Sequence, residues 1–78
     1  MPGALILITT KVGAMREVSE EIKKLDKIQE TEMLTGPYDI MAVARADKLM
    51  DITNTLIEEI RSIDKVEETT TNIFIEYE

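Results

Sequence analysis

Apolar and polar positions along the 78-residue chain follow two different periodicities. Short runs rich in apolar and β-branched residues predict four strands, because such side chains suit a pleated sheet. These strands are expected at 4–10, 28–35, 38–45 and 66–77. Apolar residues recur at helical spacing over 15–25 and 49–63, with Asp47 as a candidate N-cap of the second helix. Gly36-Pro37 predicts a hairpin between the second and third strands, so the order of elements is βαββαβ.

The chain also contains an internal repeat. Residues 20–31 (EEIKKLDKIQET) and 58–69 (EEIRSIDKVEET) are identical at seven positions, with an offset of 38. Chance similarity among abundant Glu, Lys and Ile is an alternative explanation, but the order of elements is independently twofold. Two βαβ units with right-handed crossovers form a ferredoxin-like α+β sandwich. We therefore predict this fold class, with an antiparallel sheet in the strand order 4-1-3-2.

Both central strands of that sheet are apolar on both faces. Residues 5–8 and 40–44 contain no charged side chain, whereas the edge strands contain Glu and Thr. Two helices cover only one face of a four-stranded sheet, and exposed apolar patches usually mark interaction sites. The sequence therefore predicts a second copy packed sheet against sheet.

Composition limits the chemistry. A chain of 78 residues is expected to form a single domain, 1–78. It has no Cys and no His, the commonest soft metal ligand and the commonest general base, so we expect no metal, no cofactor and no disulfide. The net charge of −7 opposes direct binding to nucleic acid. No secretory signal or membrane span is recognisable, so the expected location is the cytoplasm.

Two segments are candidates for a binding site. Gly36, Tyr38 and Asp39 lie in the predicted hairpin, where turn N–H groups could hold a carboxylate and Asp39 could accept from an ammonium group. The alternative is a plain turn in which Asp39 caps the local backbone. Thr69, Thr70 and Thr71 could contact a small polar ligand, although Thr is also an ordinary residue of an exposed strand.

Catalytic groups are scarce by comparison. The residues usable by a small enzyme of this fold do not form a convincing pair; they are Lys11, Tyr38, Asp39 and Arg45. Adjacent Glu pairs on the helices lie on the polar side and suit a solvated face. We therefore predict no catalytic residue and no enzyme activity.

The hairpin segment 35–39 (TGPYD), followed by Val43, Asp47, Val66 and the threonines, resembles the effector-binding domain of the Lrp/AsnC family, also called RAM. The resemblance covers the whole chain. No helix-turn-helix domain of the kind that usually precedes this module is recognisable in these 78 residues, so the expectation from the resemblance is a stand-alone RAM protein with a role in transcription regulation.

The resemblance implies sheet-to-sheet dimers that assemble into an octamer or a ring, with an amino-acid effector bound between subunits. Carried over position by position, it points to Gly36, Tyr38 and Asp39, and then to the three threonines at 69–71. It also implies full-length Lrp/AsnC regulators as partners. Two alternatives stay open: a structural subunit that binds no ligand, and a small ferredoxin-like enzyme.

Overall fold

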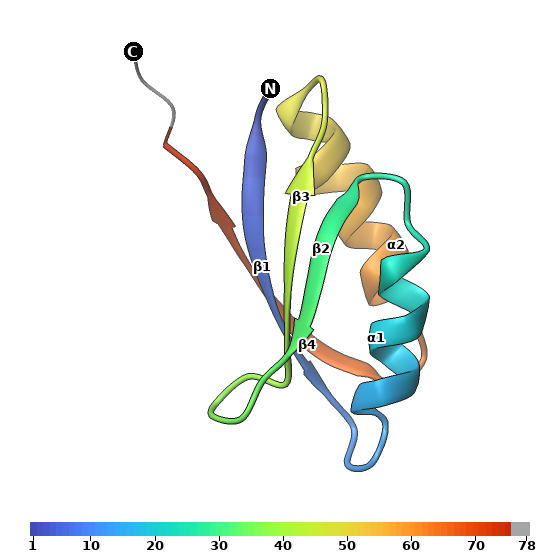
Figure 1. Ribbon diagram of the computed structural model, residues 1–78. Coiled ribbons are helices and arrows are strands. Elements are labelled where there is room, and N and C mark those ends of the chain that lie inside the picture. Colours follow the sequence, from blue (N-terminus) through green and yellow to red (C-terminus); the bar gives the residue numbers. More distant parts are fainter. Residues whose placement is uncertain (76–78) are drawn as a thin grey trace.

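The computed structural model describes residues 1–75, which form one antiparallel sheet and its covering helices (Figure 1). The sheet order is β2-β3-β1-β4, which is the predicted order 4-1-3-2. The ferredoxin-like α+β class is therefore confirmed. The elements are β1 Gly3–Thr10, α1 Met15–Lys23, β2 Ile28–Met33, β3 Ile40–Arg45, the π-helical segment η1 Asp51–Leu56, α2 Ile57–Arg61 and β4 Val66–Ile73.

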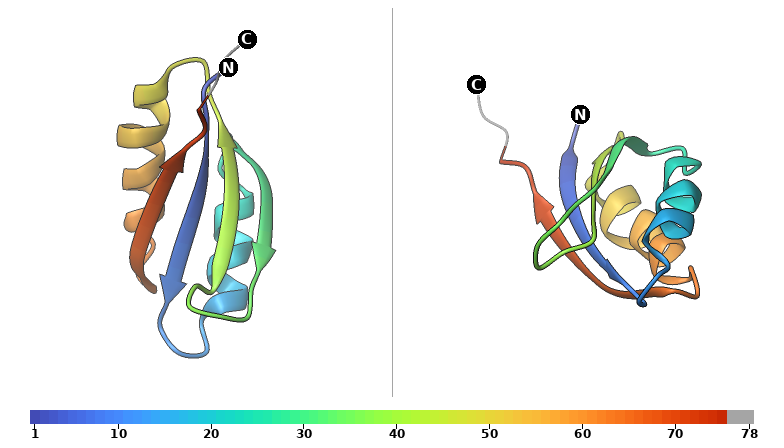
Figure 2. Two further views of the ribbon diagram at one scale, coloured as in Figure 1. Left: turned by 90° about the vertical axis from the view of Figure 1, so that its left-hand side faces the viewer. Right: turned by 60° about the horizontal axis from the view of Figure 1, so that its bottom comes forward.

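The helices lie together on one face of the sheet, and the core lies between them and the central strands (Figure 2). Burial alternates along β1 and β3 because neighbouring side chains point to opposite faces. The largest fully buried apolar side chains come from both layers: Ile6, Ile8, Val18, Ile22, Ile40, Ile52, Leu56 and Ile60. The predicted apolar stripe of α1 is thus confirmed at Val18 and Ile22.

The opposite face of the sheet is free of helices in the described chain. Leu5 pairs with Val43, and Leu7 pairs with Met41, so these four apolar side chains share that face and are only half-buried. We call them the open-face cluster. Its edges are polar: Glu30 and Glu32 stand opposite Val43 and Met41 on β2, and Thr70 stands opposite Leu7 on β4.

The two repeats occupy equivalent places. Residues 20–31 supply the end of α1 and most of β2, and 58–69 supply the end of α2 and the start of β4. Leu5 and Val43, which are separated by the repeat offset of 38, pair directly with each other at the centre of the sheet. The two halves of the chain are therefore similar both in sequence and in the places that they occupy in the fold.

Element boundaries differ from the prediction in three places. The hairpin is longer, since β2 ends at Met33 and β3 begins only at Ile40. β4 ends at Ile73, and the part of the predicted last strand at 76–77 lies outside the described residues. Asp47 is not an N-cap, because the segment η1 has Met50 at that position, and Leu49 is 42% exposed rather than part of the core.

The π-helical turn has a local cause. The sequence Thr53-Asn54-Thr55 combines three residues of low helix propensity. The Thr53 hydroxyl donates to the carbonyl of Leu49 at 3.3 Å, a contact that competes with regular helical bonding. Ile52 and Leu56 remain fully buried on either side of this turn, so the widening does not remove the helix from the core.

One end of the open face is closed by an arginine. The Arg45 guanidinium lies 5.1 Å from the centroid of the Phe74 ring, and its Nη1 donates to the carbonyl of Met1 at 3.0 Å. Gly3, the residue paired with Arg45, lies beneath this side chain. A Cβ on Gly3 would stand 2.7 Å from Nη1 of Arg45, so the crossing depends on the absence of a side chain there.

Candidate functional site

Asp39 attaches the β2–β3 hairpin to the end of β1. Its Oδ2 accepts a hydrogen bond from the backbone N–H of Thr10 at 2.8 Å, and the Thr10 hydroxyl lies 3.5 Å from the same oxygen. Its own N–H donates to the carbonyl of Ile8 at 2.9 Å, and its carbonyl accepts from the N–H of Leu34 at 2.8 Å. The backbone and the side chain of Asp39 therefore hold the end of the hairpin, just before β3, against the end of β1.

Gly13 places the start of α1 above the same end of the sheet. Its φ of +82° is a left-handed conformation that glycine adopts without strain, and it lets the chain reverse after β1. The N–H of Ala14 then donates to the carbonyl of Lys11 at 3.0 Å, and α1 begins at Met15. The β1–α1 loop and the hairpin thus face each other across a gap.

A pocket of about 460 Å³ occupies this gap. Its lining comes from the β1–α1 loop, the first turn of α1, the end of β2 and the hairpin: Thr10, Lys11, Val12, Gly13, Met15, Arg16, Met33 and Asp39. The volume lies within the range of small-molecule sites, which combine apolar walls with a few convergent polar groups.

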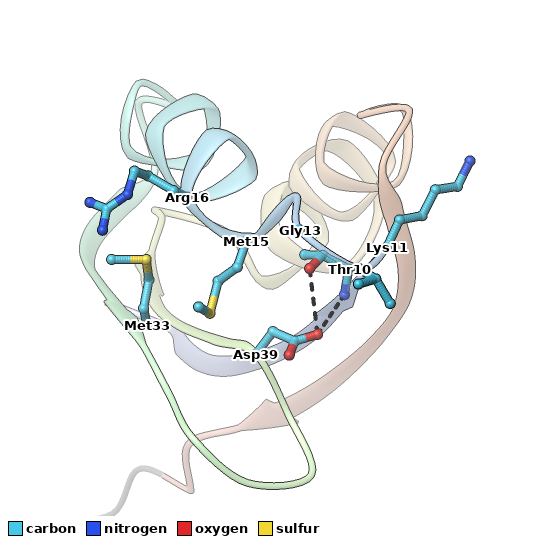
Figure 3. Close-up of a pocket in the computed structure, with 8 residues that line it drawn as sticks. Thr10, Lys11, Gly13, Met15, Arg16, Met33 and Asp39 are labelled. Carbon is cyan, nitrogen blue, oxygen red and sulfur yellow. Dashed lines mark hydrogen bonds between the residues drawn. The ribbon is translucent and has the colours of Figure 1, made fainter.

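The side chains of the pocket are arranged by kind. Figure 3 shows the thioethers of Met15 and Met33 in the space beside Asp39, while Lys11 extends outward on one side and Arg16 lies on the other. Within residues 1–75, neither Lys11 nor Arg16 belongs to an ion pair, and Asp39 is the one carboxylate of the lining. The pocket therefore offers an apolar interior, one acceptor and two long cationic side chains at its mouth.

Of the residues singled out in the sequence, Asp39 lines this pocket. Gly36 is exposed and has φ of +137°, a conformation that favours glycine, and Tyr38 is half-buried. The 34–38 turn projects beyond the sheet on the side away from the helices (Figure 1). The two sides of the hairpin thus face different surroundings: Asp39 faces the pocket, and the turn extends past the open face.

The three threonines do not form one cluster. Thr69 pairs with Ile8 and Thr71 with Ile6, so both face the helices, whereas Thr70 pairs with Leu7 on the open face. Ile40, Ile8 and Thr69 lie in one row across three strands, which puts Thr69 about 10 Å from the base of the hairpin. Within one chain, Thr70 is the member of the trio on the same side as the turn.

The remaining pocket residues were not predicted as a site. Lys11 was named only among the groups usable by a small enzyme, and Met15 and Met33 are ordinary apolar positions of a predicted helix and a predicted strand. The available signal was topological: in this sheet order the β1–α1 loop and the β2–β3 hairpin lie at the same end. The pocket forms because this loop and this hairpin are adjacent in the fold, and no sequence motif marks it.

Within the described range 1–75, no group of three or more acidic side chains is close enough to hold a metal ion. The helices of the same residues are all too short or too polar to cross a membrane.

The described chain is therefore a small α+β sandwich with four antiparallel strands, one sheet face that no helix covers, and a pocket between the hairpin and the first helix. A model of the Lrp/AsnC ligand binding domain matches residues 3–77. The chain belongs to this family, and the resemblance noted in the sequence is confirmed.

Known proteins of similar sequence and structure support the same assignment. The HTH-type transcriptional regulator FL11 of Pyrococcus abyssi is 35% identical over 72 residues, which cover 92% of this chain and 47% of that protein. TTHA0845 from Thermus thermophilus has a TM-score of 0.91 at 27% identity, with 100% of this chain and 98% of that chain covered. AsnC of E. coli has a TM-score of 0.87 at 25% identity, with 97% and 52% covered. The chain spans about half the length of the curated relatives, with 47% of FL11 and of YugG from Bacillus subtilis covered.

Proposed function

We propose that this chain is a self-associating effector-binding module of the Lrp/AsnC type, which senses a free α-amino acid and acts in transcription regulation rather than as an enzyme. The observation that carries the proposal is the half-buried Asp39 carboxylate, fixed at the base of the hairpin beside a pocket of about 460 Å³. The curated relatives are named as transcriptional regulators, which supports the regulatory role.

The chemistry of Asp39 supports a zwitterionic ligand. Among the described hydrogen bonds Asp39 uses Oδ2, and Oδ1 accepts none, so one carboxylate oxygen is available to an ammonium group. The ligand carboxylate needs donors. Within one chain Lys11 and Arg16 at the mouth of the pocket can supply them, and the N–H groups of the turn around Gly36 are further donors on the side where a neighbouring subunit packs. Tyr38 adds a hydroxyl at the same turn.

The open-face cluster supports self-association. Leu5, Leu7, Met41 and Val43 form a contiguous apolar area on a face that no helix covers in the described chain. We propose that a second copy packs against it, sheet to sheet, and that further copies complete an octamer or a ring. The turn extends past this face, so Gly36, Tyr38 and Thr70 lie where a neighbouring subunit could complete the site, whereas Thr69 and Thr71 face the helices on the other side of the sheet.

A structural neighbour, the transcriptional regulator NMB0573 from Neisseria meningitidis, was solved as a complex with L-Met, at 16% identity and a TM-score of 0.82. At that identity the likeness concerns the fold, so the proposal for this chain rests on its own pocket.

Calorimetric titration with the twenty amino acids tests the proposal. We expect one or a few to bind the wild type and to lose affinity in Asp39→Asn, because the amide keeps an acceptor for the Thr10 N–H but loses the charge that pairs with ammonium. Asp47→Asn, an exposed carboxylate outside the pocket, is the matched control. Absence of binding by every amino acid favours a structural subunit instead, and equal affinity of wild type and Asp39→Asn refutes the role of Asp39.

A further inference from the structure

Two flexible methionine side chains form part of the pocket wall. Met15 comes from the first turn of α1 and is half-buried, and Met33 comes from the end of β2 and is 40% exposed. Neither side chain has a branch, and both have a polarisable sulfur that adapts to the shape of a neighbour. No aromatic side chain lines the pocket. Such walls suit a flexible aliphatic ligand better than a rigid planar one.

The charges around the pocket match those of a zwitterion without a charged side chain. Asp39 is placed to accept an ammonium group, and Lys11 and Arg16 at the mouth have no ion-pair partner within residues 1–75. Their long side chains can turn toward a carboxylate at the entrance. A further charge on the ligand side chain would have to lie against the two thioethers, where it loses water and gains no partner.

The volume of the pocket sets a lower limit on the size of the ligand side chain. A pocket of about 460 Å³ is far larger than the side chain of glycine or alanine needs. A ligand with a short side chain would leave the thioethers without contacts on one side and would forfeit their dispersion energy. A longer aliphatic side chain would cover both methionines.

Building on the proposed function, we infer that this pocket is the side-chain subsite of the effector and that the module selects an α-amino acid with a long apolar side chain, of the methionine or norleucine type. Met15 and Met33 determine the specificity, Asp39 holds the ammonium group, and Arg16 or Lys11 closes over the carboxylate. The subsite lies within one chain, although a neighbouring copy can complete it at the turn.

The test is calorimetric titration of the intact chain with methionine, norleucine, leucine, alanine, glutamate and lysine. We expect methionine and norleucine to bind at least tenfold more tightly than alanine, since each additional methylene in an apolar pocket contributes about tenfold or more. Met33→Gln keeps the length of the side chain but makes the wall polar, and it should weaken binding of norleucine roughly tenfold. Met33→Leu should keep most of the affinity.

Met50→Gln is the matched control, because Met50 is 66% exposed and does not line the pocket. Circular dichroism and thermal unfolding verify that the variants are folded. Tighter binding of glutamate or lysine than of norleucine overturns the specificity. If an amino acid binds but Met33→Gln leaves its affinity unchanged, the subsite is wrong while the proposed function stands. If no amino acid binds, the proposed function fails and this inference fails with it.

Discussion

The crossing of Arg45 over Gly3 makes a quantitative prediction about how two substitutions combine. Gly3 has no positive φ, so alanine is compatible with its backbone. On that ground alone Gly3→Ala should stabilise the strand by about 0.4–1 kcal/mol. In the wild type, however, the new Cβ would lie within 2.7–2.9 Å of three Arg45 atoms, and the arginine has to move away.

The cost of that movement follows from the contacts that Arg45 makes. Leaving the Phe74 ring forfeits a cation–π contact of about 0.5–1 kcal/mol at an exposed site. Leaving the Met1 carbonyl forfeits a hydrogen bond of about 0.5–1.5 kcal/mol. Gly3→Ala should therefore destabilise the wild type slightly but stabilise the Arg45→Ala variant, with a coupling free energy of about 1–2 kcal/mol.

Urea denaturation of the wild type, the two single variants and the double variant measures this coupling. All four proteins are compared at one protomer concentration, because association changes the apparent stability. Measuring the effect of Gly3→Ala in the Phe74→Leu variant as well separates the contribution of the cation–π contact from that of the hydrogen bond to Met1. Additivity of Gly3→Ala and Arg45→Ala within about 0.3–0.5 kcal/mol would contradict the crossing.

Three further predictions concern the hairpin, the core and the open face. Asp39→Ala leaves the Thr10 N–H without its partner and should lower the free energy of unfolding by about 1–3 kcal/mol, and by less in Asp39→Asn; equal losses in urea denaturation would show that the hydrogen bond is unimportant. Ile60→Ala, at a fully buried position, should cost about 2–5 kcal/mol, against less than about 0.5 kcal/mol for the 85%-exposed Ile75→Ala, with calorimetric melting as the measurement. Leu7→Lys in the open-face cluster should shift sedimentation toward the monomer, whereas Met50→Lys should not; a folded monomer of the wild type at micromolar concentration would refute sheet-to-sheet packing.

The fold could be predicted because the spacing of apolar residues within each segment indicates whether it is a strand or a helix. The alternation along β1 and β3 and the stripe through Val18 and Ile22 each assign an element and a buried face. The buried stripe of the second helix could be predicted in the same way, but its π-helical turn could not. Ile52, Leu56 and Ile60 have the same spacing whether the backbone between them bonds as an α-helix or as a π-helix.

The candidate site could be predicted only in part. Asp39 stood out because an acidic residue after Gly-Pro-Tyr is distinctive, and it lies in the pocket. Thr10, Met15 and Met33 could not be read in the same way, because they come from three elements that meet only after the sheet has formed. The threonines at 69–71 look alike in the sequence, yet the pleat turns Thr70 away from its neighbours.

Binding of an amino acid with a long apolar side chain beside Asp39, against two methionines, can be observed residue by residue. The five methionines of the chain, at 1, 15, 33, 41 and 50, suit methyl NMR, since each ε-methyl group reports on its own surroundings. On titration with norleucine, we expect large shifts of the Met15 and Met33 signals, no shift of Met50, and loss of the response in Asp39→Asn. Norleucine binding that leaves the Met15 and Met33 signals unchanged would contradict the assignment of this pocket as the effector site.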